Sequence, residues 1–219
     1  WGLNTSGQLG DGTLVNKSSP VQIGSSSWTA VAAGVNSLHM AAIRSDGYLF
    51  AWGSNNGGQV GDGTTVDKSS PVQIGSSSWT AVRTGDRHCV AIRSGGTLFT
   101  WGLGSVGQLG DGTNAGKLSP VQIGSSSWTA VAAGNFHSGG IRTGGTLFTW
   151  GYNTQGQLGD GTSTVRSSPV VLGNLAVTRA SSPVQIGSSS WTAVSAGHFH
   201  AAGIRSGGTL FTWGLGTGG

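Results

Sequence analysis

The chain has 219 residues, of which 42 are Gly; 8% are charged, and 11 basic against 7 acidic side chains give a net charge of +4. An apolar share of 36% excludes a disordered polar tract, and the lack of an 18-residue apolar run excludes a membrane-spanning helix. The absence of Glu and the scarcity of Lys exclude a helix-rich fold. The positive charge reflects few acids, so nucleic acid is not an expected partner.

A Trp-Gly dipeptide divides the chain into repeated units. It recurs at intervals of 51, 49, 49 and 63 residues, beginning at Trp1, Trp52, Trp101, Trp150 and Trp213. A regular period near 50 residues is typical of a repeat architecture. The predicted units are 1–51, 52–100, 101–149 and 150–212, followed by a closing segment, 213–219. The fourth unit is longer because it contains an insert at about 167–180, between two copies of SSPV.

Each unit is predicted to form four short strands. In the third unit they are Ser119–Gly124, Trp128–Gly134, His137–Thr143 and Thr146–Gly151, with a two-residue hairpin turn at Gly144-Gly145. Short apolar runs separated by Gly and Ser are typical of an all-β protein. One such sheet cannot bury both of its faces, so the units must stack, with Trp and Phe between them. The sequence therefore predicts an all-β β-propeller of four repeats.

The motifs resemble the regulator of chromosome condensation repeat. The motif around GDGT reads WGLNTSGQLGDGT in the first unit, and related copies lie at Gly57–Thr64, Val106–Thr113 and Tyr152–Thr162. The resemblance covers the chain apart from the insert. It implies a propeller of about seven four-stranded blades, with repeat boundaries offset from blade boundaries. Four units either close as a four-bladed ring or form part of a larger ring, with self-assembly as one way to complete it.

Two polar positions recur once per unit and allow two interpretations each. The four His residues suggest a metal-binding ring, but the resemblance implies a structural position bonded to backbone, which we favour; they are His39, His88, His137 and His200. The Asp of each GDGT suggests paired catalytic carboxylates, but flanking Gly residues favour a turn; these are Asp11, Asp62, Asp111 and Asp160.

The sequence predicts no enzyme, cofactor or metal site. It has no nucleophile elbow and no zinc signature, and GQLGDGT lacks the Lys of a phosphate-binding loop. Cys89 stands alone, which excludes an intrachain disulfide. We therefore expect no catalytic residues.

Comparison of the units with one another indicates candidate binding loops. SPVQIGSSSWTAV and TLFTWG scarcely change, whereas three segments vary: those after Trp-Gly, after GDGT and around the His. A constant scaffold with variable loops is typical of a binding surface. The candidates from the variable segments and their neighbours are Arg83, Asp86, Arg87, Asn135, Phe136, His198 and Phe199. The insert at Val171–Ala180 is a further candidate contact.

An Arg recurs near the hairpin of every unit, at Arg44, Arg93, Arg142 and Arg205. These residues form either a basic ring for phosphate or an acidic partner, or solvated charges beside a turn. The second interpretation is the simpler one.

The leading hypothesis is a non-catalytic propeller that presents variable loops to a protein or a surface glycan. The composition resembles bacterial or phage-borne family members, which implies a surface, fibre or virion module outside the cytoplasm and nucleus. The alternative is the role of the founding member, which docks on chromatin and promotes guanine-nucleotide exchange on a small GTPase. A third possibility is a plant ultraviolet-B photoreceptor, whose G-W-R-H-T motif is matched by Gly85–His88 with Asp86 in place of Trp.

Overall fold

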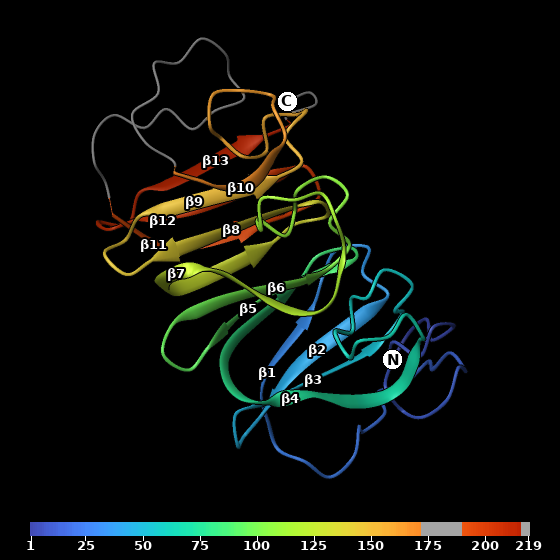
Figure 1. Ribbon diagram of the computed structural model, residues 1–219. Helices are drawn as coiled ribbons and strands as arrows, with labels where there is room; N and C mark the ends of the chain where they lie inside the picture. The colour runs from blue at the N-terminus through green and yellow to red at the C-terminus, as the bar shows by residue number, and fades with distance from the viewer. Residues whose placement is uncertain (172–189, 216–219) are drawn as a thin grey trace.

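The computed structural model describes residues 1–171 and 190–215. In these residues the strands form an antiparallel ten-stranded series and a separate three-stranded sheet (Figure 1). The strands are β1 (Trp28–Ala33), β2 (His39–Arg44), β3 (Tyr48–Gly53), β4 (Lys68–Thr84), β5 (His88–Arg93), β6 (Thr97–Gly102), β7 (Lys117–Ala133), β8 (His137–Arg142), β9 (Leu147–Gly151), β10 (Arg166–Val171), β11 (Trp191–Ala196), β12 (His200–Arg205) and β13 (Leu210–Gly214). No helix among the described residues is long and apolar enough to cross a membrane.

The ten-stranded series consists of three blades joined by long strands. β4 has 17 residues; its first part pairs with β3 (Gly53↔Lys68) and its second part with β5 (Trp79↔Arg93). It is therefore the outer strand of one blade and the inner strand of the next. β7 does the same, so the blades are offset from the repeats, as the resemblance implies.

These long strands correct the prediction of four separate strands per unit. The sequence predicts two strands here, at Ser119–Gly124 and Trp128–Gly134. The structure instead has one continuous strand, β7, which contains the first range and ends at Ala133, one residue before the end of the second. The Ser residues between them do not interrupt it, because Ser127 pairs with Thr97 and a bulge next to Trp128 redirects the chain. A bulge bends a strand without ending it.

The core lies between the blades, where the predicted aromatic packing is confirmed. Trp79 contacts Phe99 edge to face, with ring centroids 5.4 Å apart, and the fully buried Trp101 at 6.0 Å. Ile43 and Leu49 of one blade belong to the same buried cluster. Such aromatic pairs contribute stabilisation beyond their buried area. Among the described Trp residues, Trp1 is 73% exposed and Trp28 is partly exposed, whereas the others are buried.

The first unit departs from the predicted pattern. Lys17–Gly24 has the same sequence, KSSPVQIG, as Lys68–Gly75 at the start of β4. In the first unit this segment forms no strand and makes a single bridge, Gly2↔Lys17. This segment forms no strand because, in the described residues, no third strand of a preceding blade lies beside it to pair with.

The blades form an open arc (Figure 1). Val31 in the first blade is 64% exposed, whereas its counterparts Val82 and Val131 are 0% and 3% exposed. In the last blade Leu210 is 62% exposed, whereas its counterpart Leu98 is fully buried. A closed four-bladed ring would bury both ends. The described blades therefore do not close as a four-bladed ring and correspond to part of a propeller.

Candidate functional site

The GDGT loops are structural, as the turn interpretation predicts. In the second unit Asp62 accepts hydrogen bonds from the Thr64 backbone N–H (3.0 Å) and hydroxyl (2.8 Å), and Gly63 has a φ of +82°. Burial raises the pKa of Asp62, but hydrogen bonds from Lys68 and Thr64 outweigh it and lower the pKa to about 2. The carboxylate stays ionised and paired with Lys68, 2.9 Å away, so it is not an acid catalyst at neutral pH.

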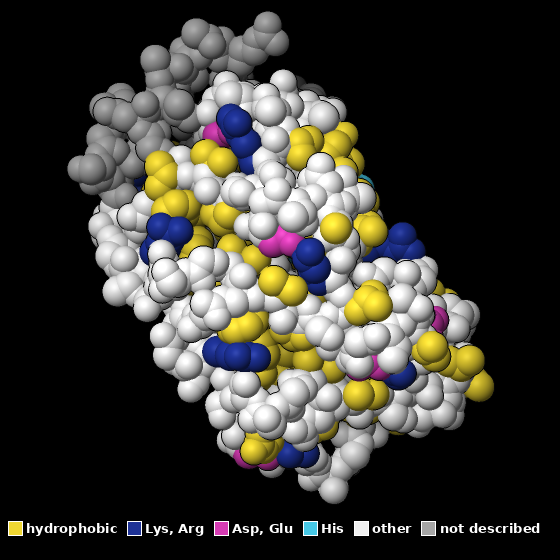
Figure 2. Space-filling view, in the orientation of Figure 1, with side chains coloured by type: hydrophobic (Ala, Val, Ile, Leu, Met, Phe, Trp, Pro, Cys, Tyr) yellow, Lys and Arg dark blue, Asp and Glu magenta, His cyan; other side chains and the backbone are white. Residues whose placement is uncertain are grey.

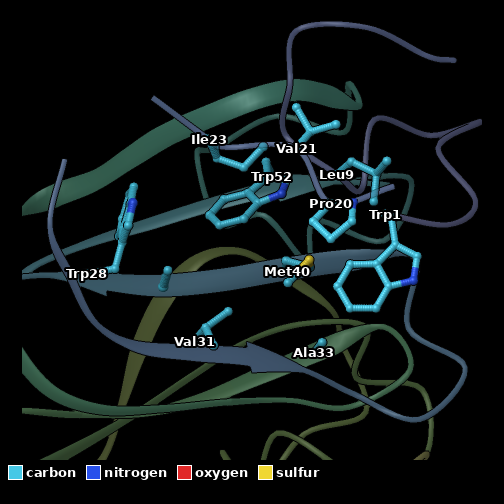
Figure 3. Close-up of a pocket in the computed structure, with 11 residues that line it drawn as sticks. Trp1, Leu9, Pro20, Val21, Ile23, Trp28, Val31, Ala33, Met40 and Trp52 are labelled. Atoms are coloured by element: carbon cyan, nitrogen blue, oxygen red, sulfur yellow. The ribbon is translucent and has the colours of Figure 1, made fainter. Parts of the chain in front are cut away.

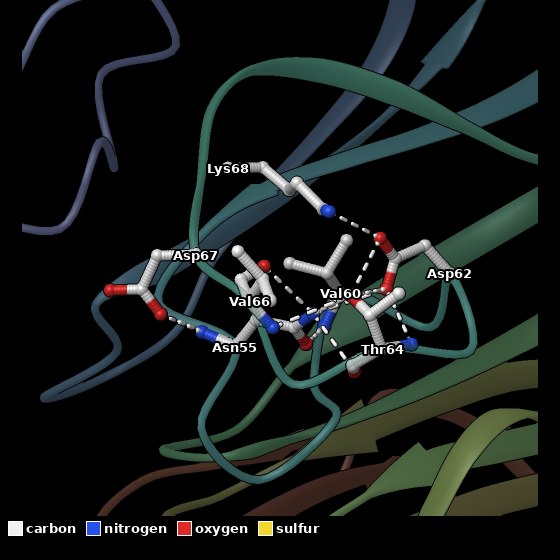
Figure 4. Close-up of polar contacts among 7 residues, drawn as sticks. All are labelled: Asn55, Val60, Asp62, Thr64, Val66, Asp67 and Lys68. Carbon is white, nitrogen blue, oxygen red and sulfur yellow. Dashed lines mark hydrogen bonds and ion pairs between the residues drawn. The ribbon is translucent and has the colours of Figure 1, made fainter.

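A buried Asn organises the same loop (Figure 4). The Asn55 amide Nδ2 donates to Asp62 (3.1 Å) and to the Thr64 carbonyl (3.0 Å), while its Oδ1 accepts from the Val60 N–H at 2.9 Å. Asn4 and Asn153 have the same role in their units. These Asn residues lie in a segment treated as variable, so the segment is partly a scaffold element.

Two of the recurrent His residues, His39 and His88, contact the neighbouring blade, whereas His200 in the last blade is exposed. His39 Nε2 lies 3.3 Å from Cys89 Sγ, and His88 Nε2 lies 2.9 Å from Ser138 Oγ, each partner belonging to the next blade. Burial lowers the pKa of both rings to about 3, so they are neutral. This agrees with the structural interpretation, and side chains of the next blade are partners in addition to the implied backbone. Among the described residues, no three metal-ligating side chains form a group that could hold a metal ion.

The recurrent Arg residues are stacked on aromatic rings. Arg93 Cζ lies 3.9 Å from the Phe99 ring centroid, and Arg142 Cζ lies 4.0 Å from that of Phe148. Arg44 and Arg205 stack in the same way. Such cation–π contacts stabilise the protein by about 0.5–1 kcal/mol at exposed sites. These Arg side chains are partly exposed beside the hairpin turns and also contact the aromatic rings of the core.

The opposite end of the blades gathers candidate residues from three units. Asp86, Asn135 and His198 each follow the Gly at the end of an inner strand, and we call them the axial ring. The Asp86 N–H donates to the Asn135 carbonyl (3.3 Å), and the Asn135 N–H donates to the Gly197 carbonyl (3.2 Å). These bonds draw the strand ends together. The structure thus joins three residues that are far apart in the sequence.

The axial ring has an acidic side chain with basic side chains close to it. Burial raises the pKa of Asp86, whereas the charges of Arg87 and His198 act in the opposite direction. The Asn135 side-chain oxygen is buried and accepts no hydrogen bond from the described part of the chain. The axial ring therefore places a carboxylate, a buried amide and an imidazole within a small area.

The residues that follow the axial ring form a second row. Arg87, Phe136 and Phe199 make up this outer row. The Arg87 guanidinium donates to Asn56 Oδ1 at 2.6 Å, and Phe136 contacts Tyr152 with ring centroids 6.4 Å apart. Asn56 and Tyr152 were missed as candidates, although both lie in the variable segment after Trp-Gly.

The remaining candidates lie elsewhere. Arg83 is exposed on β4, and its guanidinium donates to the Val82 carbonyl at 2.8 Å. The four hairpin Arg residues are at the other end of the blades, because Arg44 pairs with Trp28 at the start of β1, whereas Met40 pairs with Ala33 at its end. Of the insert at about 167–180, residues 167–171 are described, as part of β10, and the rest falls outside the described residues. Figure 2 shows Lys and Arg side chains scattered over one face, several beside Asp, and no basic patch on that face.

Comparisons with known proteins agree with this architecture. The model of the regulator of chromosome condensation repeat matches residues 1–39, 46–92, 95–141 and 144–204. The curated ultraviolet-B receptor UVR8 of Arabidopsis thaliana is 40% identical over 76 residues, which are 34% of this chain and 17% of that protein.

Two solved structures show the same fold. Human WBSCR16 has a TM-score of 0.78 and 24% identity, over 96% of this chain and 55% of that one. Prp20p of Saccharomyces cerevisiae has a TM-score of 0.72 and 21% identity, over 89% of this chain and 47% of that one. The chain thus spans about half the length of these structures and less than a fifth of the curated relative.

Proposed function

The chain belongs to the regulator of chromosome condensation repeat family, and we propose that it is a non-catalytic scaffold that binds a partner through the axial ring and the outer row. One observation carries this proposal: residues that vary between otherwise near-identical repeats meet at one end of three neighbouring blades. Variable residues on a rigid scaffold are the usual composition of a recognition surface.

The side chains of this site favour a protein partner. Asp86 and Arg87 supply opposite charges, and Phe136 and Phe199 supply aromatic surface. Arg and aromatic residues are common among the side chains that dominate binding energy at protein interfaces. A surface glycan is the other ligand class that this combination suits.

Most of the Asp carboxylates are held in ion pairs or hydrogen bonds, which supports a role without catalysis. The Asp of each GDGT is paired with Lys or Arg. Asp46 is paired with Arg44, and Asp67 accepts a hydrogen bond from the Asn55 backbone. Six of the seven Asp residues are thus committed to local structure, which leaves Asp86, at the axial ring.

A peptide selection tests this proposal. We expect the chain to enrich specific sequences from a phage-displayed random peptide library. The triple variant Arg87→Ala, Phe136→Ala and Phe199→Ala should bind the selected peptides at least about tenfold more weakly, a loss of about 1.4 kcal/mol. The control carries three Ala substitutions at exposed positions elsewhere, Leu14, Val66 and Asn114. Unchanged peptide binding by the first variant would contradict the proposed site, and binding to a glycan array alone would assign the other ligand class.

Guanine-nucleotide exchange is the alternative function. Prp20p has binding properties toward Gsp1p and histones, but a likeness at 21% identity supports the fold and not that activity. We expect no acceleration of fluorescent-nucleotide release from small GTPases, since no acidic and aromatic loop set of that kind is apparent in the sequence. Accelerated release would replace the scaffold proposal. The photoreceptor is not proposed, because Asp86 occupies the position of the motif Trp.

We also propose that the scaffold serves as a module of a bacterial or phage surface or fibre protein. The Gly-rich composition without Glu supports this setting. Secretion signals or fibre-like domains in the parent reading frame would agree with it, whereas a nuclear targeting signal would oppose it.

A further inference from the structure

The hairpin Arg residues differ from unit to unit in what they pair with. In the first unit the Arg44 guanidinium pairs with the Asp46 carboxylate, whose Oδ2 lies 2.7 Å from Nη2 and 2.9 Å from Nε. The same guanidinium lies 4.7 Å from the Phe50 ring centroid, so stacking on an aromatic ring and pairing with a carboxylate are compatible. The position of Asp46 is taken by Gly95 in the second unit and by Gly144 in the third. These two units therefore lack the carboxylate that the first unit places beside its Arg.

Arg93 and Arg142 have no acidic neighbour of their own. In the described part of the chain neither guanidinium takes part in an ion pair, and the Nε of each is buried without a hydrogen-bond partner. Removing part of a charged group from water costs free energy unless an opposite charge or an acceptor compensates. An anion bound at either residue would supply that compensation.

The aromatic rings hold both guanidinium groups in a defined orientation. Arg142 Cζ lies 4.9 Å from the Trp128 ring and 4.0 Å from the Phe148 ring, measured to the centroids. Arg93 stacks in the same way in the preceding blade. A side chain that is already immobilised loses less conformational entropy when a ligand binds. The planar fork of its N–H groups matches the two oxygens of a carboxylate.

The space beside both residues is open. A Cβ placed on Gly95 or Gly144 would meet no atom within 4 Å. These are the positions from which the Asp46 side chain reaches its Arg in the first unit. A carboxylate from another molecule can therefore approach where the chain itself provides none.

The larger opening lies at Arg142. A cavity of about 550 Å³ is lined there by residues of β7, of the end of β8 and of β10, and by the loop that precedes β7. Its charged groups are Arg142, Lys117 and Asp111. The Asp111 carboxylate is already paired with Lys117, 3.1 Å away, and accepts two hydrogen bonds from Thr113. Two cations against one carboxylate leave the cavity with a positive charge, and Arg142 is the cation without a partner.

A cavity of about 600 Å³ in the first blade has a different chemistry (Figure 3). Its lining is apolar and includes Trp28, Met40 and Trp52, with no charged side chain. An ionised ligand would lose its hydration there without gaining a partner. An acidic ligand is therefore favoured at Arg142 and not in the first blade.

We propose that Arg93 and Arg142 bind carboxylates of an acidic peptide segment, with the cavity at Arg142 as the main contact. The pairing of Asp46 with Arg44 shows, within the same chain, how an Asp side chain occupies such a position. The contact lies at the hairpin end of the blades, since Arg93 pairs with Trp79 at the far end of the inner strand from the axial ring. It is therefore a second site, separate from the one proposed above.

Fluorescence anisotropy of a rhodamine-labelled peptide tests this proposal on the 219-residue chain. The probe is the dipeptide Asp-Ser repeated four times, and its control is Asn-Ser repeated four times, which has the same length and no side-chain carboxylate. At about 20 mM salt, where exposed charges are weakly screened, the Asp peptide should bind at least about tenfold more tightly than the Asn peptide. Equal binding of the two peptides, or no binding of the Asp peptide at millimolar protein, would overturn the proposal.

Three single substitutions locate the contact. Arg142→Gln should weaken binding of the Asp peptide at least about fivefold, and adding Arg93→Gln should remove the difference between the two peptides. The matched control is Arg44→Gln, which removes the same charge from the same position of the repeat, but from an Arg that already holds a carboxylate. The control should bind within about twofold of the unaltered chain. An equal loss in Arg44→Gln and Arg142→Gln would show that net charge alone attracts the peptide, and the proposed site would be wrong.

Arg142→Lys separates the guanidinium from its charge. Lys keeps the positive charge but has no planar fork, so the Asp peptide should bind at least about threefold more weakly; unchanged binding would contradict a paired carboxylate. Inorganic phosphate at constant ionic strength should not displace the peptide, and displacement would assign the site to phosphate. Near-ultraviolet circular dichroism, which reports the packing of Trp128 beside Arg142, checks that each variant is folded.

Discussion

The Trp101→Ala variant is expected to lose about 3–5 kcal/mol of unfolding free energy, the range found for truncation of large buried aromatics. Trp101 is fully buried, its indole N–H donates to the Gln59 carbonyl at 2.9 Å, and its ring packs 6.0 Å from that of Trp79. The loop at Gly61 lies against it, where an added Cβ would stand 2.6 Å from the indole nitrogen. Truncation would therefore remove contacts to both the core and the loop. Urea denaturation gives the measurement.

Trp1→Ala is the matched control, since Trp1 begins the same Trp-Gly dipeptide but is 73% exposed. The control should change the free energy by no more than about 0.5 kcal/mol. Equal denaturation midpoints for the two variants would contradict the assignment of Trp101 to the space between blades.

The Asn55→Ala variant is expected to lose about 2–5 kcal/mol. Asn55 is fully buried, accepts from the Val60 N–H and donates to Asp62 and the Thr64 carbonyl. Removal of the amide takes these bonds from the Val60 N–H and the Thr64 carbonyl, at about 1–3 kcal/mol for each buried group left unsatisfied, whereas Asp62 keeps its contacts with Thr64 and Lys68. Thermal and urea unfolding of the purified variant provide the measurement.

Asn114→Ala is the control for this second substitution, because Asn114 is an exposed residue directly after a GDGT turn. It should be within about 0.5 kcal/mol of the unaltered protein. If Asn55→Ala unfolds at the same urea concentration as this control, the loop is held by its Asp and Gly residues and the amide contributes little.

Sequence patterns within a unit were sufficient to predict the features that depend on local chemistry. The Asp-Gly turn at Asp62 follows from the hydrogen-bonding habit of Asp and the positive φ that Gly permits. The burial of Trp79 and Trp101 follows from the need of each sheet to cover its faces. The repeats thus predicted both the fold class and the position of the core.

Features that depend on neighbouring blades could not be predicted in the same way. Val31 and Val82 lie in the same WTAV motif, yet one is exposed and the other buried, because burial depends on whether another blade is adjacent. The proximity of Asp86 and Asn135 depends on how the arc brings the inner strands together. Neither of these features is encoded in a single repeat.

The shared strands β4 and β7 bear on how the number of repeats in such a chain can change through recombination of its gene. A crossover at a blade boundary would fall inside a 17-residue strand. A crossover at the Trp-Gly dipeptide falls at the end of β3, β6 or β9, just before a loop, and leaves the shared strands whole. The segment that recombination can add or remove as a unit is therefore different from the segment that folds as a blade. Each added repeat contributes strands to two neighbouring blades.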